Sequence, residues 1–241
     1  MVEDLDEYSE AYAEDALYAL DNRLILKWYP QRILEKLQTG TLLELGLGHG
    51  YTAEIFGASP KVERYRVLEG SLEVIEQFRR RRDVGQTELV HVYFEDYASD
   101  ERFTNIVMGF VLEHVDDPDL ILSRYVQHVL PGGSVFIAVP NAAALNRRLG
   151  VAAGLLERLD LLSDADRAQG HKRYFDLASL RALVERNGLR IKSVEGLFLK
   201  PLTTVQLTSL NLSEAVLTAM LEVGREFPEL CTGILVEATL G

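Results

Sequence analysis

A short apolar run that leads directly into a glycine-rich turn is the feature that most constrains how this chain folds. The run covers residues 42–45, and it is followed by Gly46-Leu47-Gly48-His49-Gly50. Glycine is required where the backbone takes a positive φ or where a ligand approaches it closely. A strand, a glycine turn and a helix that begins near Tyr51 place a ligand at the carboxyl end of a parallel strand. The segment therefore predicts a ligand-binding α/β fold.

Apolar runs then alternate with helix-like segments. The runs occupy residues 42–45, 65–68, 89–94, 106–108 and 135–139. This alternation is typical of a parallel sheet that is covered by helices on both faces.

Two further apolar runs, residues 190–199 and 233–240, are separated by a predicted helix near residues 213–227. A helix over residues 177–187 is expected to end at Gly188, a natural residue after a helix end. The last run reaches the end of the sequence, so its strand can insert between its predecessor and the rest of the sheet. We therefore expect an α/β fold with a doubly wound, mostly parallel seven-stranded sheet and an antiparallel C-terminal strand.

The length of 241 residues fits one domain, residues 1–241. The first 36 residues have helical spacing, and Pro30 permits a new helix to start around it. We interpret residues 1–38 as an N-terminal helical lid.

Composition excludes several classes of protein. The net charge of −12 argues against a broad nucleic-acid surface, because phosphate neutralisation needs clustered basic side chains. No apolar window approaches a membrane span, and the acidic amino terminus does not resemble a secretory signal, so a cytoplasmic protein without membrane binding is expected. The single cysteine, Cys231, excludes an internal disulfide framework.

Acidic residues end the next two predicted strands. Glu69 lies 23 residues after Gly46, where a carboxylate can accept both hydroxyl protons of a ribose. Glu95 and Asp96 follow the third strand at the same edge of the sheet. These acids fit the adenosine of either a dinucleotide or a sulfonium cofactor.

These motifs resemble the class I S-adenosylmethionine-dependent methyltransferases, in particular the small-molecule branch with an E-H-V tripeptide after strand four. The tripeptide here begins at Glu113, and the family's E/D-x-G-x-G-x-G pattern begins at Glu44. The resemblance covers residues 40–140 well and the rest more loosely. It implies a Rossmann-like methyltransferase fold and S-adenosyl-L-methionine as the cofactor.

The resemblance also implies roles for individual residues. The glycine turn would hold the methionine part, Glu69 the ribose and Asp96 the adenine amino group, while the backbone of Gly109 would face the methionine ammonium. The complete set of expected cofactor-binding residues is Glu44, Gly46, Leu47, Gly48, Gly50, Glu69, Gly70, Ser71, Phe94, Glu95, Asp96, Gly109 and Phe110.

The E-H-V segment also resembles that of ubiquinone-pathway O-methyltransferases, in which carboxylates and the histidine hold a divalent cation. Glu113 and His114 match that arrangement, but its first carboxylate falls on Phe110. Since one carboxylate holds a hard cation poorly, no metal site is expected.

The predicted acceptor side combines residues near the strand ends with residues 141–176, interpreted as a variable segment that covers the acceptor. His114 and His171 are the candidate catalytic bases, against helix packing and a helix-capping turn as the structural alternatives. The candidate acceptor-binding residues are Tyr8, Tyr12, Asn141, Arg173 and Tyr174. Packing of an amphipathic helix is the slightly favoured explanation of the two lid tyrosines, and a turn or a helix cap explains Asn141 equally well.

These observations predict methyl transfer to an oxygen or nitrogen of a small polar metabolite, with a sugar or secondary-metabolite intermediate as the leading acceptor. A nicotinamide-dependent oxidoreductase is disfavoured because the third glycine comes one residue too early. A non-catalytic subunit that binds S-adenosylmethionine, or another reaction of the same cofactor, stays open. The small-molecule acceptor is the expected partner, and a homodimer is compatible with the sequence.

Overall fold

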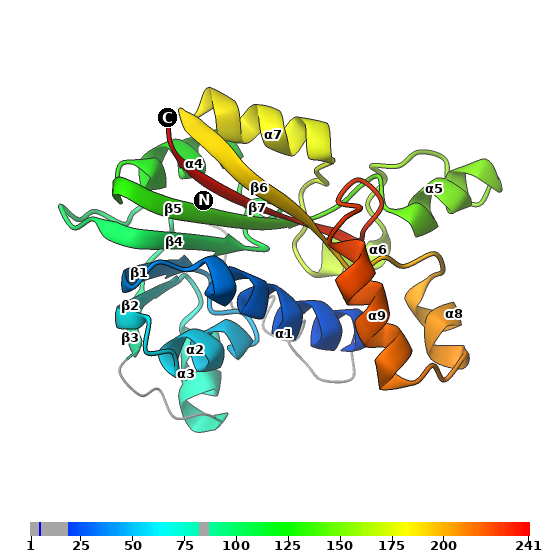
Figure 1. The fold of residues 1–241 in the computed structure, drawn as a ribbon, viewed down its shortest axis with the longest axis horizontal. Helices are drawn as coiled ribbons and strands as arrows, with labels where there is room; N and C mark the ends of the chain where they lie inside the picture. The colour runs from blue at the N-terminus through cyan, green and yellow to red at the C-terminus, as the bar shows by residue number, and fades with distance from the viewer. Residues whose placement is uncertain (1–4, 6–18, 82–86) are drawn as a thin grey trace.

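A computed structural model describes residues 5, 19–81 and 87–241 of the chain. Helices and strands alternate along it (Figure 1), in the following order: α1 (Ala19–Lys36), β1 (Gly40–Leu45), α2 (Tyr51–Gly57), β2 (Val62–Glu69), α3 (Leu72–Arg81), β3 (Thr87–His91), β4 (Phe103–Gly109), α4 (Pro118–Val126), β5 (Val129–Pro140), α5 (Leu145–Ala152), α6 (Asp164–Ala168), α7 (Leu177–Arg186), β6 (Leu189–Leu197), α8 (Thr204–Ser209), α9 (Glu214–Gly224) and β7 (Gly233–Leu240).

The strands form a seven-stranded sheet in the order β3-β2-β1-β4-β5-β7-β6. Strands β1 to β5 pair in parallel, whereas β7 is antiparallel to both β5 and β6. The last strand therefore inserts between its predecessor and the rest of the sheet, and the predicted doubly wound fold is confirmed. The third strand, Thr87–His91, begins two residues before the predicted run of residues 89–94 and ends three residues before its end, because the chain leaves the sheet and turns at residues 94–96.

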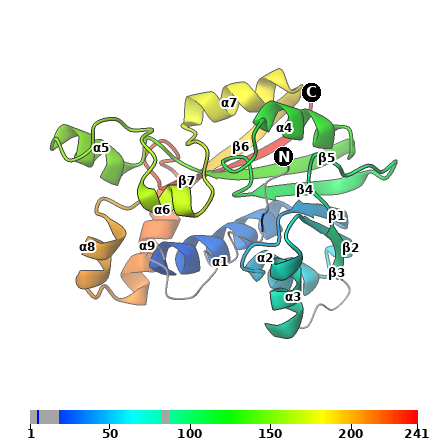
Figure 2. The same cartoon turned by 180° about the vertical axis from the view of Figure 1, so that it is seen from behind.

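Helices cover both faces of the sheet (Figures 1 and 2). Helices α4 and α7 pack on one face through Leu122, Tyr125 and Leu180, while α1, α2, α3 and α9 pack on the other. Apolar burial on both sides explains why the strands are nearly continuous apolar runs rather than alternating ones.

Local signals fix the ends of the helices. Asp117 caps α4 by accepting a hydrogen bond from the Leu120 N–H, and Pro118 occupies its first turn. Helix α7 ends at Arg186, and Gly188 follows with φ of 76°, as the sequence predicts for the residue after the helix end. Within the described residues, no helix has the length and apolar character needed to cross a membrane.

Helix α1 departs from the expectation that a new helix starts around Pro30. Pro30 lies inside one continuous helix from Ala19 to Lys36, so that interpretation was wrong. Buried packing compensates for the lost backbone hydrogen bond, since Tyr29 and Ile33 beside the proline are almost completely buried. The guanidinium of Arg32 also pairs with the carboxylate of Glu195 on β6 at 2.9 Å.

Helices α5, α6 and α8 gather beyond the carboxyl ends of the parallel strands, at the right of Figure 1. This end of the sheet is where ligands bind in open α/β folds. The connection from β5 to α7 lies within residues 141–176, the predicted variable segment.

Candidate functional site

The turn after β1 requires glycine at three positions. Gly46, Gly48 and Gly50 all have positive φ, at 81°, 48° and 74°. Side chains are disfavoured in this left-handed region, and only glycine adopts it without strain. The turn ends at the first residue of α2, so it presents bare backbone to the cavity beside it.

Glu69 at the end of β2 joins this turn to the turn between β2 and α3. Its carboxylate accepts hydrogen bonds from the backbone N–H groups of Leu47 and Ser71, both at 2.8 Å. Burial raises the pKa of Glu69, and these N–H donors limit the rise. Backbone N–H groups of Gly48 and Gly70 also act on this carboxylate, so Glu69 is surrounded by backbone donors from both turns.

Glu44 lies beneath the turn rather than in the cavity lining. It is 1% exposed, and its carboxylate accepts a hydrogen bond from the hydroxyl of Tyr65. Burial raises the pKa of Glu44 to about 8, although the hydroxyls of Tyr65 and Thr52 act in the opposite direction. The carboxyl group therefore ties β1 to β2 and supports the turn from below.

A cavity of about 370 Å³ extends from the glycine turn to the segments after β4 and α6. Thirteen of the residues predicted from the sequence line it: Gly46, Leu47, Gly48, Gly50, Glu69, Ser71, Phe94, Gly109, Phe110, His114, Asn141, His171 and Tyr174. Gly70, Glu95, Asp96 and Arg173 are outside this lining, and the side chains of Glu95 and Asp96 are exposed in the turn after β3. Contact of these two acids with an adenine stays a prediction.

The end of β4 is closed by an aromatic side chain that the sequence did not single out. Tyr29 of α1 lies against Gly109, where a Cβ would come within 2.8 Å of its ring. The Tyr29 and Phe110 rings meet edge to face at 5.4 Å between centroids. Phe110 itself has φ of 60°, a strained conformation for a bulky residue. Glycine at position 109 is therefore needed for the close approach of α1.

Glu113 and two histidines meet at the other end of the cavity. Glu113 is completely buried, and neither carboxylate oxygen has a hydrogen-bond partner among the described residues. Its Oε1 lies 4.0 Å from Nε2 of His114, and the rings of His114 and His171 meet edge to face at 4.7 Å. Burial raises the pKa of Glu113 to about 7 despite the neighbouring His171 and Arg173. Burial and His171 lower the pKa of His114 well below its usual range.

Asp166 on α6 organises the segment that carries His171. The Asp166 carboxylate accepts a hydrogen bond from the Tyr174 hydroxyl at 3.0 Å and lies 3.5 Å from Nδ1 of His171. Burial alone would raise its pKa, but His171, Ser163 and Tyr174 bring the pKa of Asp166 down to about 2. The guanidinium of Arg147 lies over the Tyr174 ring at 4.4 Å. The acceptor side is thus a connected polar network.

Two predicted acceptor contacts have structural partners. The Arg173 guanidinium donates hydrogen bonds to the backbone carbonyls of Leu112, Val115 and Asp116. The side-chain amide of Asn141 donates to the carbonyls of Pro228 and Cys231. Their contact with an acceptor stays a prediction that this geometry does not support.

Tyr8 and Tyr12, the remaining predicted acceptor contacts, lie outside the described residues, as does most of the N-terminal part of the predicted lid.

A buried ion pair that sequence reasoning missed also lines the cavity. Lys200, before α8, pairs with the carboxylate of Asp21 on α1 and donates to the Thr204 hydroxyl at 2.8 Å. Lys200 is 3% exposed. Asp21 and Lys200 are far apart in the sequence, so no local motif could reveal them.

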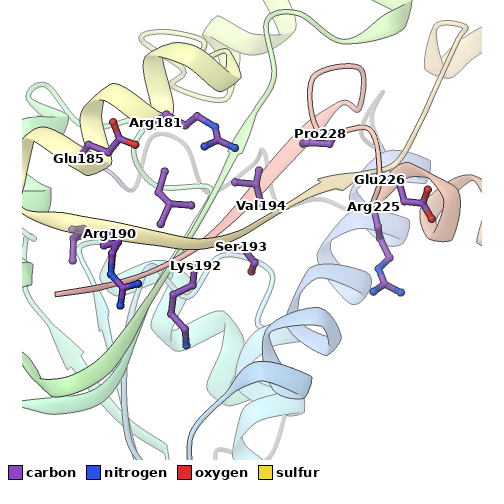
Figure 3. A pocket seen from close by; sticks show the side chains of 11 residues that line it. Arg181, Glu185, Arg190, Lys192, Ser193, Val194, Arg225, Glu226 and Pro228 are labelled. Atoms are coloured by element: carbon purple, nitrogen blue, oxygen red, sulfur yellow. The ribbon is translucent and has the colours of Figure 1, made fainter. Parts of the chain in front are cut away.

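A second hollow lies outside the edge strand β6 (Figure 3). Its exposed side chains carry both signs of charge, among them Arg181, Glu185, Arg190 and Lys192. Charged side chains of this kind protect an edge strand from pairing with other chains. It shares no described lining residue with the main cavity.

The methyltransferase domain family model matches residues 17–194. This chain belongs to that family, and the resemblance to class I S-adenosylmethionine-dependent methyltransferases is confirmed.

A curated relative, the ubiquinone biosynthesis O-methyltransferase of Pseudoalteromonas translucida (strain TAC 125), is 30% identical over 118 residues, which are 48% of this chain. The match spans 49% of the relative, about half its length.

Among solved structures, a SAM-dependent methyltransferase from Thermotoga maritima has a TM-score of 0.65 at 20% identity, over 98% of this chain and 95% of that one. The N-methyltransferase NodS from Bradyrhizobium japonicum, solved with S-adenosyl-L-homocysteine, has a TM-score of 0.60 at 13% identity, over 98% and 97% of the two chains. At these sequence identities, the structural likeness shows a shared fold and does not extend to the substrates of these two enzymes.

Proposed function

We propose that this protein transfers a methyl group from S-adenosyl-L-methionine to an oxygen or nitrogen of a small polar metabolite. One observation carries the proposal: a single cavity joins the glycine turn and Glu69 to the polar cluster of Glu113, His114 and His171. A methyltransferase needs such continuity, because the acceptor atom must line up with the carbon–sulfur bond of the cofactor.

The cofactor half of the proposal rests on the β1 and β2 ends. The left-handed glycines allow the methionine part to approach the backbone, and Glu69 is positioned to accept the ribose hydroxyl protons. Gly109 lies at the end of β4 beside Tyr29, on the path from the cofactor to the acceptor.

The acceptor half rests on the polar groups at the far end of the cavity. Glu113, His114 and His171 are the groups available to take a proton from a hydroxyl or an ammonium. Arg147 and Lys200 add N–H groups, and Tyr174 adds a hydroxyl oxygen whose proton is donated to Asp166; such polar groups fit an oxygen-rich acceptor such as a sugar or a secondary-metabolite intermediate.

The partial likeness to a ubiquinone biosynthesis O-methyltransferase favours oxygen as the methylated atom. NodS is an N-methyltransferase, so nitrogen is the second candidate. Because the likeness covers half of the relative, the acceptor is not transferred from it.

A panel assay with methyl-labelled S-adenosylmethionine tests the proposal. The panel pairs each hydroxyl compound with its amino analogue, and we expect label in at least one pair, preferentially on oxygen. Tight cofactor binding with no transfer across the panel would favour the alternative, a non-catalytic subunit that binds S-adenosylmethionine. Absence of cofactor binding would contradict both functions.

A further inference from the structure

Three metal-ligand side chains converge from two separate segments. Glu113 and His114 follow β4, whereas His171 lies between α6 and α7. One donor atom from each residue lies within 4.8 Å of the others. Ligand atoms that are each bound at about 2 Å lie no more than about 4 Å apart, so small side-chain rotations would bring these three donors onto one cation.

Backbone contacts fix the two segments against each other. The N–H of Lys172, next to His171, donates to the Glu113 carbonyl at 2.8 Å. Arg173 donates to carbonyls of the loop that carries Glu113 and His114. The convergence is therefore held by one backbone–backbone hydrogen bond and by the Arg173 side chain bound to backbone carbonyls.

The buried carboxylate of Glu113 has no donor to satisfy it. Both oxygens are inaccessible and have no hydrogen-bond partner among the described residues. Unsatisfied buried polar atoms are rare, and an isolated buried carboxylate is costly. A cation bound here would supply the missing positive charge.

Each histidine of the cluster also has an outer partner. Nδ1 of His171 lies 3.5 Å from Oδ1 of Asp166, and the backbone of Gly170 forms a hydrogen bond with His114. Imidazoles that bind metals usually direct their other nitrogen to a carboxylate or a carbonyl, which orients the ring. The Asp166 carboxylate is placed to orient the His171 ring in this way.

We propose that Glu113, His114 and His171 bind one divalent first-row transition cation, of the class of Zn²⁺, Mn²⁺ or Co²⁺. Two imidazoles and one carboxylate suit these ions, whereas Mg²⁺ and Ca²⁺ prefer oxygen ligands. The third ligand could not be recognised in the sequence, because Phe110 occupies the nearby position and His171 is 57 residues from His114.

The three protein ligands leave coordination positions free on the cavity side, where His114 is 36% exposed. An oxygen of the acceptor fits such a position, so the cation selects acceptors with a hydroxyl or a pair of adjacent oxygens; with the cation bound, the coordinating atoms of the three ligands no longer serve as bases. This last step rests on the proposed methyl transfer, whereas cation binding itself does not.

Cobalt titration of the untagged, chelator-treated full chain tests the site. We expect visible d–d absorption that saturates at one Co²⁺ per chain. The variants Glu113→Gln and His171→Gln should each weaken binding by about tenfold or more. His128→Gln is the matched control, because His128 bonds to the Glu101 carbonyl and is outside the cavity lining, and it should bind Co²⁺ like the wild type.

Proton NMR of the Co²⁺-loaded wild type tests the site without requiring any variant to fold. Two shifted, exchangeable imidazole N–H resonances are expected, one from each histidine, and their absence overturns the site. Absence of Co²⁺ binding by the wild type, or unchanged binding by both glutamine variants, overturns it as well.

Calorimetric titration of the same samples with S-adenosylmethionine separates the two claims. Cofactor binding without Co²⁺ binding rejects the metal site alone, whereas loss of cofactor binding rejects the proposed function.

Discussion

The two ends of the main cavity are built in different ways. The cofactor end comes from one continuous stretch, residues 44–71, in which β1, the glycine turn and β2 follow each other. The acceptor end is assembled from α1, the loop after β4, α6 and the segment before α8. Local backbone geometry therefore determines the first end, while long-range side-chain pairs hold the second. Substitutions at the two ends should therefore have different effects on stability and on cofactor binding.

The largest effect is expected at the acceptor end, from Lys200→Met. This change leaves the carboxylate of Asp21 buried, with the Thr204 hydroxyl as its one remaining side-chain partner among the described residues. The free energy of unfolding should fall by about 3 kcal/mol, measured by urea denaturation. Arg80→Met, which breaks an exposed pair with Glu76, is the control and should cost less than about 1 kcal/mol. An equal loss of unfolding free energy in the two variants would contradict the conclusion that the buried pair of Asp21 and Lys200 stabilises the fold.

Glu44 beneath the cofactor end should make stability depend on pH. Its pKa is about 8 in the folded protein and about 4.5 when unfolded, so the native state holds a proton that the unfolded chain releases between these values. The stabilisation is complete below pH 4.5 and is lost as the pH rises to about 8, by on the order of 1 kcal/mol per pH unit.

Glu44→Gln removes this titration while keeping the shape of the side chain. Between pH 5 and pH 9, the thermal unfolding temperature of the ligand-free protein should therefore fall less steeply with pH for the variant than for the wild type. Parallel curves would show that Glu44 is not the group responsible.

Glycine substitutions separate backbone strain from ligand contact. Gly46→Ala and Gly132→Ala place a side chain at nearly the same φ, 81° and 78°, but only Gly46 lines the cavity. Both should lose about 1–2 kcal/mol of stability. Only Gly46→Ala should also weaken S-adenosylmethionine binding, by about tenfold, or 1.4 kcal/mol, in calorimetry. Equal affinities for the two variants would argue against cofactor binding at the turn.

Tyr174→Phe should have the smallest effect. It removes the hydrogen bond to Asp166, which keeps donors from Ser163, and the longer one that the hydroxyl accepts from Arg147 at 3.3 Å. The loss of stability should be about 0.5–1.5 kcal/mol, and the affinity for S-adenosylmethionine should not change. A marked loss of cofactor affinity would show that the two ends are coupled, contrary to the comparison above.

The same contrast explains what could be predicted from the sequence. The glycine spacing and Glu69 were recognisable because their geometry follows from consecutive residues on one strand–turn–helix unit. The topology followed from the order of apolar runs, including the insertion of β7. Pro30 was misread because a local helix signal was overridden by burial of α1 against the sheet.

The acceptor end was predicted only in part. His114, His171 and Tyr174 were identified by their positions, but Tyr29, Asp166 and Lys200 were not. Each missed residue acts through a partner on another element, and a single sequence carries no record of such pairs. Arg173 shows the reverse case, because its charge suggested a ligand but its guanidinium holds a loop.

Calorimetric titration of the wild type and Glu69→Ala with S-adenosylmethionine tests the central claim most directly. A bidentate contact of the ribose with a buried carboxylate predicts that the variant loses on the order of 1.5–3 kcal/mol of binding free energy. Glu76→Ala, on the exposed face of α3, should bind like the wild type. Absence of binding by the wild type, or equal affinity in Glu69→Ala, would contradict the account.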